Sequence, residues 1–436
     1  MNHTYIIQYA PNHLTQFDKH INTIFPQSKT LTETIHISRL TAICLKYPLN
    51  VVIVAHSSNA IDIPQHIPCV IYRSTPASDE LKVHRLIYNT AWIDTVDSIH
   101  DIIVSFIERL PTRILSFPIV ASNPSIFWQY PVITERFCLE RIAAISNIPF
   151  IYVGIPFATL IDRNILPNPE LIQLHKQIQT LKLANPTLRI ITACQHIHYI
   201  RIMPIVKMLG FTDIYLAHKL KGQSQYESII LHGLPLYPVN VLDTSRSIGI
   251  QYDTLKSINR QYLFSFIGAH MRHYLNPIRK RILEWPPSKD NTYIIRDTKI
   301  WHFEKAVYQH QVRGNELTTA DITHQDAQTH EYNRVITQSI FSLCPVGAGP
   351  NTIRLWESIC LGSIPVIIAD EFSIEDFVPS HFGTDWYIEL PYTSQHLISP
   401  GHLETYLKSI SQDRINMMKM KCFDVAEHIK QAFVTV

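Results

Sequence analysis

The sequence is poor in charge, in glycine and in long apolar runs, and these shortages exclude several classes of protein. Charged residues occupy only 17% of the 436 positions and the formal net charge is +2, so the broad basic surface typical of nucleic-acid binding is absent. The most apolar window, IPFIYVGIPFATLI, is broken by proline and glycine and is shorter than the roughly 20 residues of a membrane span. We therefore expect no nucleic-acid partner and no membrane-spanning helix.

The cysteines and histidines of the sequence form neither a disulfide framework nor a metal-binding pattern. The seven cysteines are odd in number and scattered, which is typical of small core residues in a reducing compartment. The 23 histidines form no HExxH or paired CxxC/HxxxH framework, and no Asp-x-Asp pair occurs, so no metal site is expected. The start, MNHTYIIQYAPNH, lacks the basic and apolar regions of a signal peptide. We expect a cytoplasmic protein, with peripheral attachment to the inner face of the membrane left open.

Short β-branched apolar runs alternate with helical patterns along the chain. This alternation predicts parallel sheets covered by helices on both faces, and the chain is long enough for two domains. The rhythm is interrupted at residues 234–261, where turn-forming residues follow no clean period. We therefore predict an N-terminal domain at residues 1–246 and a C-terminal domain at 247–436. The last amphipathic run, about residues 412–434, is long enough to pack back on the N-terminal domain.

One stretch, FSLCPVGAGPNTIRLWESICLGSIPVIIAD from Phe341, concentrates the scarce glycines. It predicts a buried strand, a glycine-containing loop, and a helix with Asn351 as N-cap and Gly362 as its stop. This order presents free backbone N–H groups and the positive end of a helix to an anion. No GxGxxG and no GxxxxGK[ST] occurs, which excludes the nicotinamide fingerprint and the P-loop.

On the predicted helix, Arg354 lies in the first turn and Glu357 lies one turn deeper, about 5 Å along the axis. A cation at phosphates and a carboxylate one turn further suit the pyrophosphate and the ribose hydroxyls of a nucleotide. The same spacing also fits a plain ion pair on a solvated helix face. Spacing alone leaves both interpretations open.

The wider segment EYNRVITQSIFSLCPVGAGPNTIRLWESICLGSIPVIIAD resembles the donor-domain signature of the exostosin-like glycosyltransferases, family 47. The upstream stretch LFSFIGAHMRHYLNPIRKRIL resembles a second segment of that family. One departure is the pair Asn351-Thr352, which replaces the usual Ser at the start of the helix. The matching positions are Phe264, Phe266, Gly268, Arg279, Tyr332, Ser339, Phe341, Leu343, Pro345, Gly347, Arg354, Glu357, Gly362, Pro365, Val366 and Asp370.

The resemblance implies an α/β protein with the type B glycosyltransferase fold, in which two Rossmann-like domains face each other across a cleft. It implies inverting, metal-independent transfer from a nucleotide sugar, expected to be a UDP-sugar, to a glycan or lipid-linked glycan in cell-surface polysaccharide synthesis. The nucleotide sugar is a substrate, so no cofactor is expected. A chain without a stem or anchor suggests a bacterial-type member.

The resemblance also implies a set of site residues. Glu357 is expected at the ribose hydroxyls, and Arg354 with Arg279 at the diphosphate, where they act as catalytic cations. The general base is expected at the carboxyl ends of the N-terminal strands, where His196 is favoured over His198, His218 and His56. The expected donor-binding residues are Gly268, Arg272, Gly347, Gly349, Asn351, Thr352, Arg354, Glu357 and Asp370.

Two rival interpretations stay open. A fucosyltransferase-like enzyme would use a GDP-sugar, but its donor helix typically opens with Val-Thr-Glu-Lys, where this chain has Asn-Thr-Ile-Arg. A non-catalytic scaffold for nucleotides or carbohydrates would keep the fold and lack the base. Binding of UDP without any transfer of sugar would favour the scaffold.

Overall fold

The structure, a computed structural model, describes residues 5–9, 29–31, 51–55, 69–74, 81–86, 114–116, 126–143, 150–166, 169–184 and 187–431. The candidate base His56 lies outside these ranges, and so does the stretch HDIIVSFIERL at residues 100–110, whose pattern predicts a helix. The described strands form three sheets. The first has the order β2-β1-β3-β4-β5 and is parallel except for β5. Its strands are β1 (Tyr5–Tyr9), β2 (Lys29–Leu31), β3 (Val51–Ala55), β4 (Cys69–Ser74) and β5 (Leu81–Leu86).

The second sheet has the order β10-β11-β9-β8-β7-β6 and is parallel except for the edge strand β10. Its central strands β7, β8 and β9 are buried along their whole length, as expected for parallel strands covered on both faces. Gly210 closes helix α8 with a φ of +83°. The elements are β6 (Ile114–Ser116), α5 (Thr134–Ala143), β7 (Ile151–Gly154), α6 (Phe157–Asp162), α7 (Pro169–Ala184), β8 (Ile190–Cys194), α8 (Met203–Leu209), β9 (Asp213–Leu216), β10 (Gln225–Tyr226) and β11 (Ile229–Gly233).

The third sheet has the order β13-β12-β14-β15-β16 and is parallel throughout. The strand order reverses between β12 and β14, and ligands of open α/β sheets bind at such reversals. The elements are α9 (Val239–Leu242), which connects from the second sheet, β12 (Tyr262–Gly268), α10 (Ile278–Leu283), β13 (Tyr293–Asp297), a π-helix at Lys305–Val312, α11 (Thr319–Thr337), β14 (Ser339–Pro345), α12 (Ile353–Cys360), β15 (Ile364–Ile368), β16 (Ile388–Glu389), α13 (Pro400–Lys408) and α14 (Gln412–Gln431).

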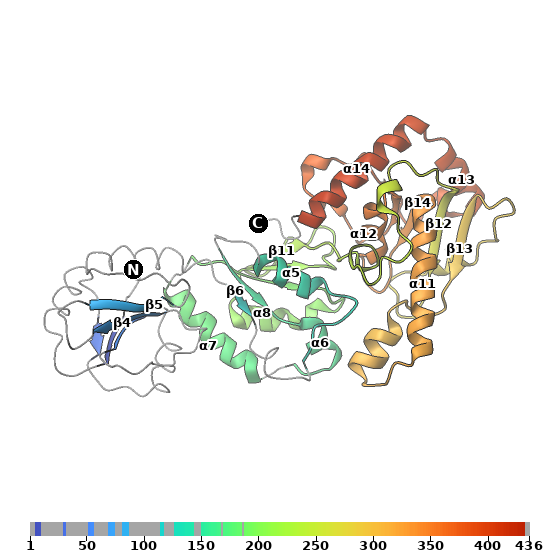
Figure 1. Cartoon of the computed structure of the whole chain (residues 1–436). Coiled ribbons are helices and arrows are strands. Elements are labelled where there is room, and N and C mark those ends of the chain that lie inside the picture. The colour runs from blue at the N-terminus through green and yellow to red at the C-terminus, as the bar shows by residue number, and fades with distance from the viewer. Residues whose placement is uncertain are drawn as a thin grey trace.

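The second and third sheets, each with its helices, lie side by side in Figure 1. Tyr152 and Tyr215 of the second sheet belong to the same hydrophobic cluster as Trp356 of the third. The opposite face of the second sheet packs a separate cluster that includes Val153 and Ile214. Two parallel α/β units that meet along one shared cluster confirm the predicted type B arrangement.

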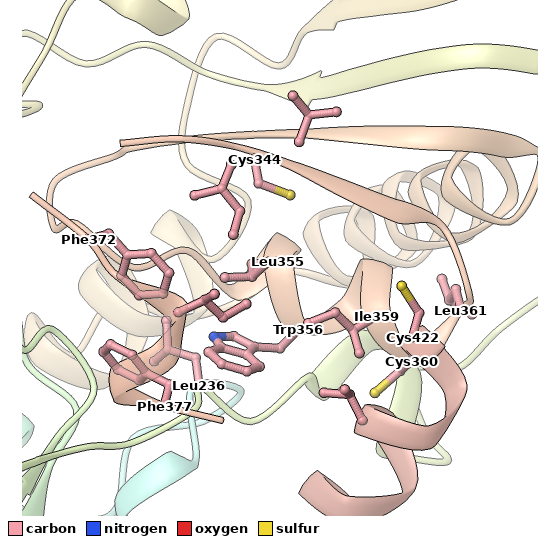
Figure 2. Packing of buried hydrophobic residues seen from close by; sticks show 14 of the residues in the cluster. Leu236, Cys344, Leu355, Trp356, Ile359, Cys360, Leu361, Phe372, Phe377 and Cys422 are labelled. Carbon is pink, nitrogen blue, oxygen red and sulfur yellow. The ribbon is translucent and has the colours of Figure 1, made fainter. Parts of the chain in front are cut away.

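Helix α12 is buried on all sides. Figure 2 shows the indole of Trp356 beside Leu236 and Phe377, with Cys360 further along the helix. Cys422, also labelled there, belongs to α14. The spacing of Arg354 and Glu357 left open an ion pair on a solvated helix face, but every residue from Arg354 to Cys360 is buried. That alternative is wrong because α9 and α14 also contact the helix.

The division at residue 246 stays a prediction, because the strands before it form two separate sheets. Helix α14 packs against α12 and β15 of the third sheet, and its Lys419 Nζ donates to the carbonyl of Lys256. The packing of this helix on the N-terminal domain therefore also stays a prediction. In the part of the chain that the structure describes, no helix is long and apolar enough to cross a membrane.

Candidate functional site

A cavity of about 600 Å³ lies between the second and third sheets. One wall follows the carboxyl ends of β8 and β9, with His196 and His218. The other wall follows the carboxyl ends of β12, β13 and β14, with Gly268, Thr298 and the loop 347–349. The cavity therefore lies where parallel α/β sheets ordinarily bind their ligands.

Arg354, in the first turn of α12, is held by aromatic rings. Its guanidinium lies 4.8 Å from the ring centre of Phe266 and 4.9 Å from that of Tyr332, which is a cation–π arrangement. Nη1 is buried and has no hydrogen-bond partner among the described residues, although the side chain lines the cavity. The structure shows no ion pair with Glu357. A buried cation with an unsatisfied N–H favours an anionic ligand.

Arg279, on α10, has a different environment. Its Nη2 donates to Pro345 O at 3.0 Å and its Nε donates to Val346 O at 2.8 Å. Burial lowers the pKa of this guanidinium to about 10. Its Nη2 would lie only 3.0 Å from a Cβ at Gly347, so that glycine also makes room for the arginine. Arg279 therefore braces the end of β14 and adds a second uncompensated positive charge to the cavity.

Glu357 is completely buried, and both of its carboxylate oxygens have protein partners. Tyr332 Oη donates to Oε2 at 2.6 Å, and the backbone N–H of Asn240 donates to Oε1 at 3.2 Å. Burial raises the pKa of the Glu357 carboxyl. Asn240 belongs to the connector between the two sheets, and its Oδ1 accepts from Arg246 Nε at 2.9 Å. Glu357 lines the cavity, but it also fastens the connector to α12.

Asn351 connects the two walls instead of capping α12. Its Nδ2 donates to Ala217 O at 2.7 Å, and its Oδ1 accepts from Trp356 Nε1 at 2.8 Å. The N-cap position belongs to Thr352, whose side chain makes no capping bond. The predicted N-cap is therefore wrong, because both ends of the amide are used elsewhere.

His196, the favoured base, has both ring nitrogens engaged. The backbone N–H of His198 donates to Nδ1 at 2.9 Å, so that nitrogen carries no proton, and Nε2–H donates to Asp162 Oδ1 at 3.0 Å. No lone pair is then free to accept a proton from a substrate. The other candidate on this wall, His218, is buried, and burial lowers its pKa to about 3.

The predicted residues divide into two groups by position. Arg272 is exposed and does not line the cavity. Asp370 is also exposed and outside the lining, and its Oδ1 accepts from Tyr392 N at 3.1 Å. The predicted residues that the structure brings together around the cavity are His196, Gly268, Arg279, Gly347, Gly349, Asn351, Thr352, Arg354 and Glu357.

Sequence reasoning missed the aromatic part of the site. Phe266 and Tyr332 lie within the family-like motifs, but no role was assigned to them, although they hold Arg354. Trp301, Tyr308 and Tyr274 also line the cavity. In the described part of the chain, no group of three His, Cys, Asp or Glu side chains is arranged to hold a metal ion.

Comparison with known proteins gives one family match and two short local matches. Residues 231–376 match the family described as the exostosin GT47 domain. The probable glucuronoxylan glucuronosyltransferase IRX7 of Arabidopsis thaliana is 54% identical over 39 residues, 9% of each chain. A probable glucuronosyltransferase of Oryza sativa subsp. japonica is 49% identical over 43 residues, 10% of each chain. The matched stretch thus spans about a tenth of the length of these curated relatives.

Two solved structures resemble the whole chain only distantly. Anabaena Alr3699/HepE in complex with UDP aligns with a TM-score of 0.30 and 8% identity, over 98% of this chain and 95% of that one. MurG of Acinetobacter baumannii aligns with a TM-score of 0.26 and 8% identity, over 98% of both chains. The family match is the finding that bears on identity. Residues 231–376 match the exostosin GT47 domain, which confirms the resemblance that the motifs indicate.

Proposed function

We propose that the protein is a glycosyltransferase whose donor is a nucleotide sugar, with the donor diphosphate at Arg354 and the loop 347–349. The observation that carries this proposal is the buried, unpartnered Nη1 of Arg354 in the wall of the cavity. A guanidinium removed from water without a partner is costly, and a diphosphate would supply charge-assisted hydrogen bonds. The exostosin GT47 domain supports the same activity.

The proposed reaction is an inverting displacement. The acceptor oxygen forms a bond to the anomeric carbon on the face opposite the diphosphate, the bond from that carbon to the diphosphate oxygen breaks, and the acceptor proton passes to a base. Arg354 and Arg279 supply preorganised positive charge to the departing diphosphate. Because two guanidiniums are present and the chain has no Asp-x-Asp pair, we propose that transfer proceeds without a divalent metal.

We propose a UDP-sugar as donor and a glycan or lipid-linked glycan as acceptor, in polysaccharide synthesis at the cytoplasmic face of the membrane. Support for the donor comes from the relatives, which are named as probable glucuronosyltransferases. UDP-glucuronic acid is therefore the first donor to test. The base is not His196 in the conformation described, because its Nδ1 already accepts from His198 N–H.

The test is a thermal-shift comparison of UDP, UDP-glucuronic acid, GDP-fucose and uridine, in buffer with EDTA, followed by assays of hydrolysis and transfer. A ligand at 100 times its Kd stabilises the folded protein by about 2.7 kcal/mol. We expect UDP and a UDP-sugar to raise Tm and uridine to have little effect. A shift with GDP-fucose alone would favour the fucosyltransferase-like alternative, and stabilisation by UDP without turnover of any UDP-sugar would favour the scaffold. No shift with any nucleotide would reject the proposal.

A further inference from the structure

The segment after β9 is fastened to the C-terminal domain on both sides of His218. Before it, the carbonyl of Ala217 accepts a hydrogen bond from Asn351 Nδ2 at 2.7 Å. After it, Lys219 Nζ forms an ion pair with Asp376 Oδ2 at 2.8 Å, and the Lys219 side chain is only 5% exposed. These contacts cross from the second sheet to the third, so they fix the position of His218 relative to the glycine loop.

The imidazole of His218 lies directly against that loop. A Cβ at Gly349 would be 2.3 Å from His218 Nδ1, so the ring occupies the space that a side chain there would need. His218 is 7% exposed and lines the cavity. Its Nδ1 is buried and has no hydrogen-bond partner among the described residues. A polar atom in this position ordinarily has a partner, which here points to a ligand.

The charge state of the ring defines what it can offer. Burial, together with the nearby His196 and His198, lowers the pKa of His218 to about 3, so the ring is neutral at pH 7. A neutral imidazole has one N–H donor and one acceptor nitrogen. It can therefore donate to an anion without adding a third positive charge beside Arg354 and Arg279.

The anion-binding part of the cavity needs such a donor. The N–H groups of Arg279 are directed to backbone carbonyls, which leaves Arg354 as the cavity guanidinium with an unpaired N–H in the described structure. A diphosphate has more oxygens than one guanidinium can satisfy. The unpartnered nitrogen of His218 lies on the opposite wall, next to the loop proposed to hold these oxygens.

We propose that His218 is a donor-binding residue supplied by the N-terminal domain, whose ring N–H hydrogen bonds to an oxygen of the nucleoside diphosphate held at the loop 347–349. The inference rests on the proposed function and adds to it that both domains hold the diphosphate. His218 lies against the phosphate loop through Gly349, so the phosphate rather than the acceptor hydroxyl is its partner.

The test compares three variants with the wild-type protein. His218→Phe keeps a ring against Gly349 and removes the N–H, and His218→Asn places an amide near the position of Nδ1. His381→Phe makes the same ring replacement at an exposed position that does not line the cavity and serves as the control. The Kd of UDP is measured by calorimetry and that of uridine by ligand-observed NMR, and Tm reports folding.

We expect His218→Phe to weaken UDP binding at least ~10-fold, as for one lost hydrogen bond to a charged group, and to leave uridine binding unchanged. His218→Asn should retain UDP affinity within about 3-fold of wild type, a much smaller loss than that of one hydrogen bond to a charged group. His381→Phe should have no effect. Equal UDP affinity of the Phe variant and wild type would overturn the inference while the proposed function stands. The same holds if the Phe variant loses only kcat, which would assign His218 to the base. A wild-type protein that binds neither UDP nor GDP would overturn both.

Discussion

At the scale of single residues, the imidazole of His218 occupies the place that a side chain at position 349 would take. We expect Gly349→Ala to lower the free energy of unfolding by about 1–3 kcal/mol, the usual cost of forced overpacking. In a His218→Ala background the cost should fall toward zero, because the ring is gone. Chemical denaturation of the single and double variants measures this coupling.

The matched control is Gly401→Ala in α13, where the nearest atom to an added Cβ is Ser399 Oγ at 3.8 Å. Alanine is favoured over glycine within a helix, so this variant should be neutral or stabilising. A Gly349→Ala cost that is the same with and without His218 would contradict the described packing of the two walls.

Residue roles could be predicted where they depend on neighbours in the sequence. Arg354 follows a glycine-containing loop at the start of a helix, and that local order indicates an anion site. Asn351 was misassigned because its partner, Ala217, lies 134 residues away. His196 was favoured for its place at a strand end, but Asp162 and His198 engage its ring nitrogens. No spacing in the sequence reports such contacts.

At the scale of elements, Glu135 joins three of them in the N-terminal wall of the cavity. It lies at the start of α5, and its Oε1 accepts from Gln195 N after β8 at 3.0 Å and from Ala158 N in α6 at 3.2 Å. Ala158 and Gln195 both line the cavity. Burial raises the pKa of Glu135 to about 8 in spite of these N–H donors.

This pKa predicts a pH-dependent stability. Between the ordinary carboxyl value of 4.5 and about 8, the folded state retains a proton that the unfolded chain releases, so the free energy of unfolding falls as pH rises. Glu135→Gln has no proton to release, so its stability should fall less than that of wild type between pH 5 and pH 8. The difference should be at least ~1 kcal/mol, since one pKa unit corresponds to about 1.4 kcal/mol. Parallel urea denaturation curves of the two proteins at both pH values would contradict the assignment.

Elements were predictable where burial leaves a simple pattern. The strands β7, β8, β9, β14 and β15 are buried and mostly apolar because helices cover both faces of each sheet. The π-helix at Lys305–Val312 was missed, since its hydrogen bonds span five residues and do not produce a period of 3.6. Helix α12 was placed correctly, but its environment was not, because burial on all sides erases the contrast between faces.

At the scale of the whole molecule, the ion pair between Lys219 and Asp376 holds the two domains together at the cavity. The Lys219 side chain is 5% exposed and the Asp376 side chain is 31% exposed. Removal of the aspartate leaves a buried ammonium without a partner, whereas removal of the lysine leaves a carboxylate that water can reach. We expect Asp376→Asn to lower the free energy of unfolding by ~3 kcal/mol and Lys219→Met to lower it by clearly less. Calorimetric unfolding compares them, and the reverse order would contradict the burial of Lys219.

The two-domain architecture itself follows from the alternation of strands and helices. The assembly of the site from both domains does not, because it depends on pairs such as Asn240 with Glu357, which are 117 residues apart. The sequence predicts an anion site at the loop 347–349, and only the folded chain shows what faces that loop.

The central claim is that Arg354 binds the diphosphate of a nucleotide donor. Calorimetric titration of UDP into the wild-type protein and into Arg354→Met tests this claim most directly. Methionine preserves much of the side-chain volume between Phe266 and Tyr332 and removes the charge. We predict that the variant binds UDP about 100-fold more weakly, as expected for a lost charge-assisted contact of ~3 kcal/mol. Without ligand it should unfold no more easily than wild type, because the unpaired buried cation is gone. An Arg354→Met protein that binds UDP as tightly as wild type would contradict the account.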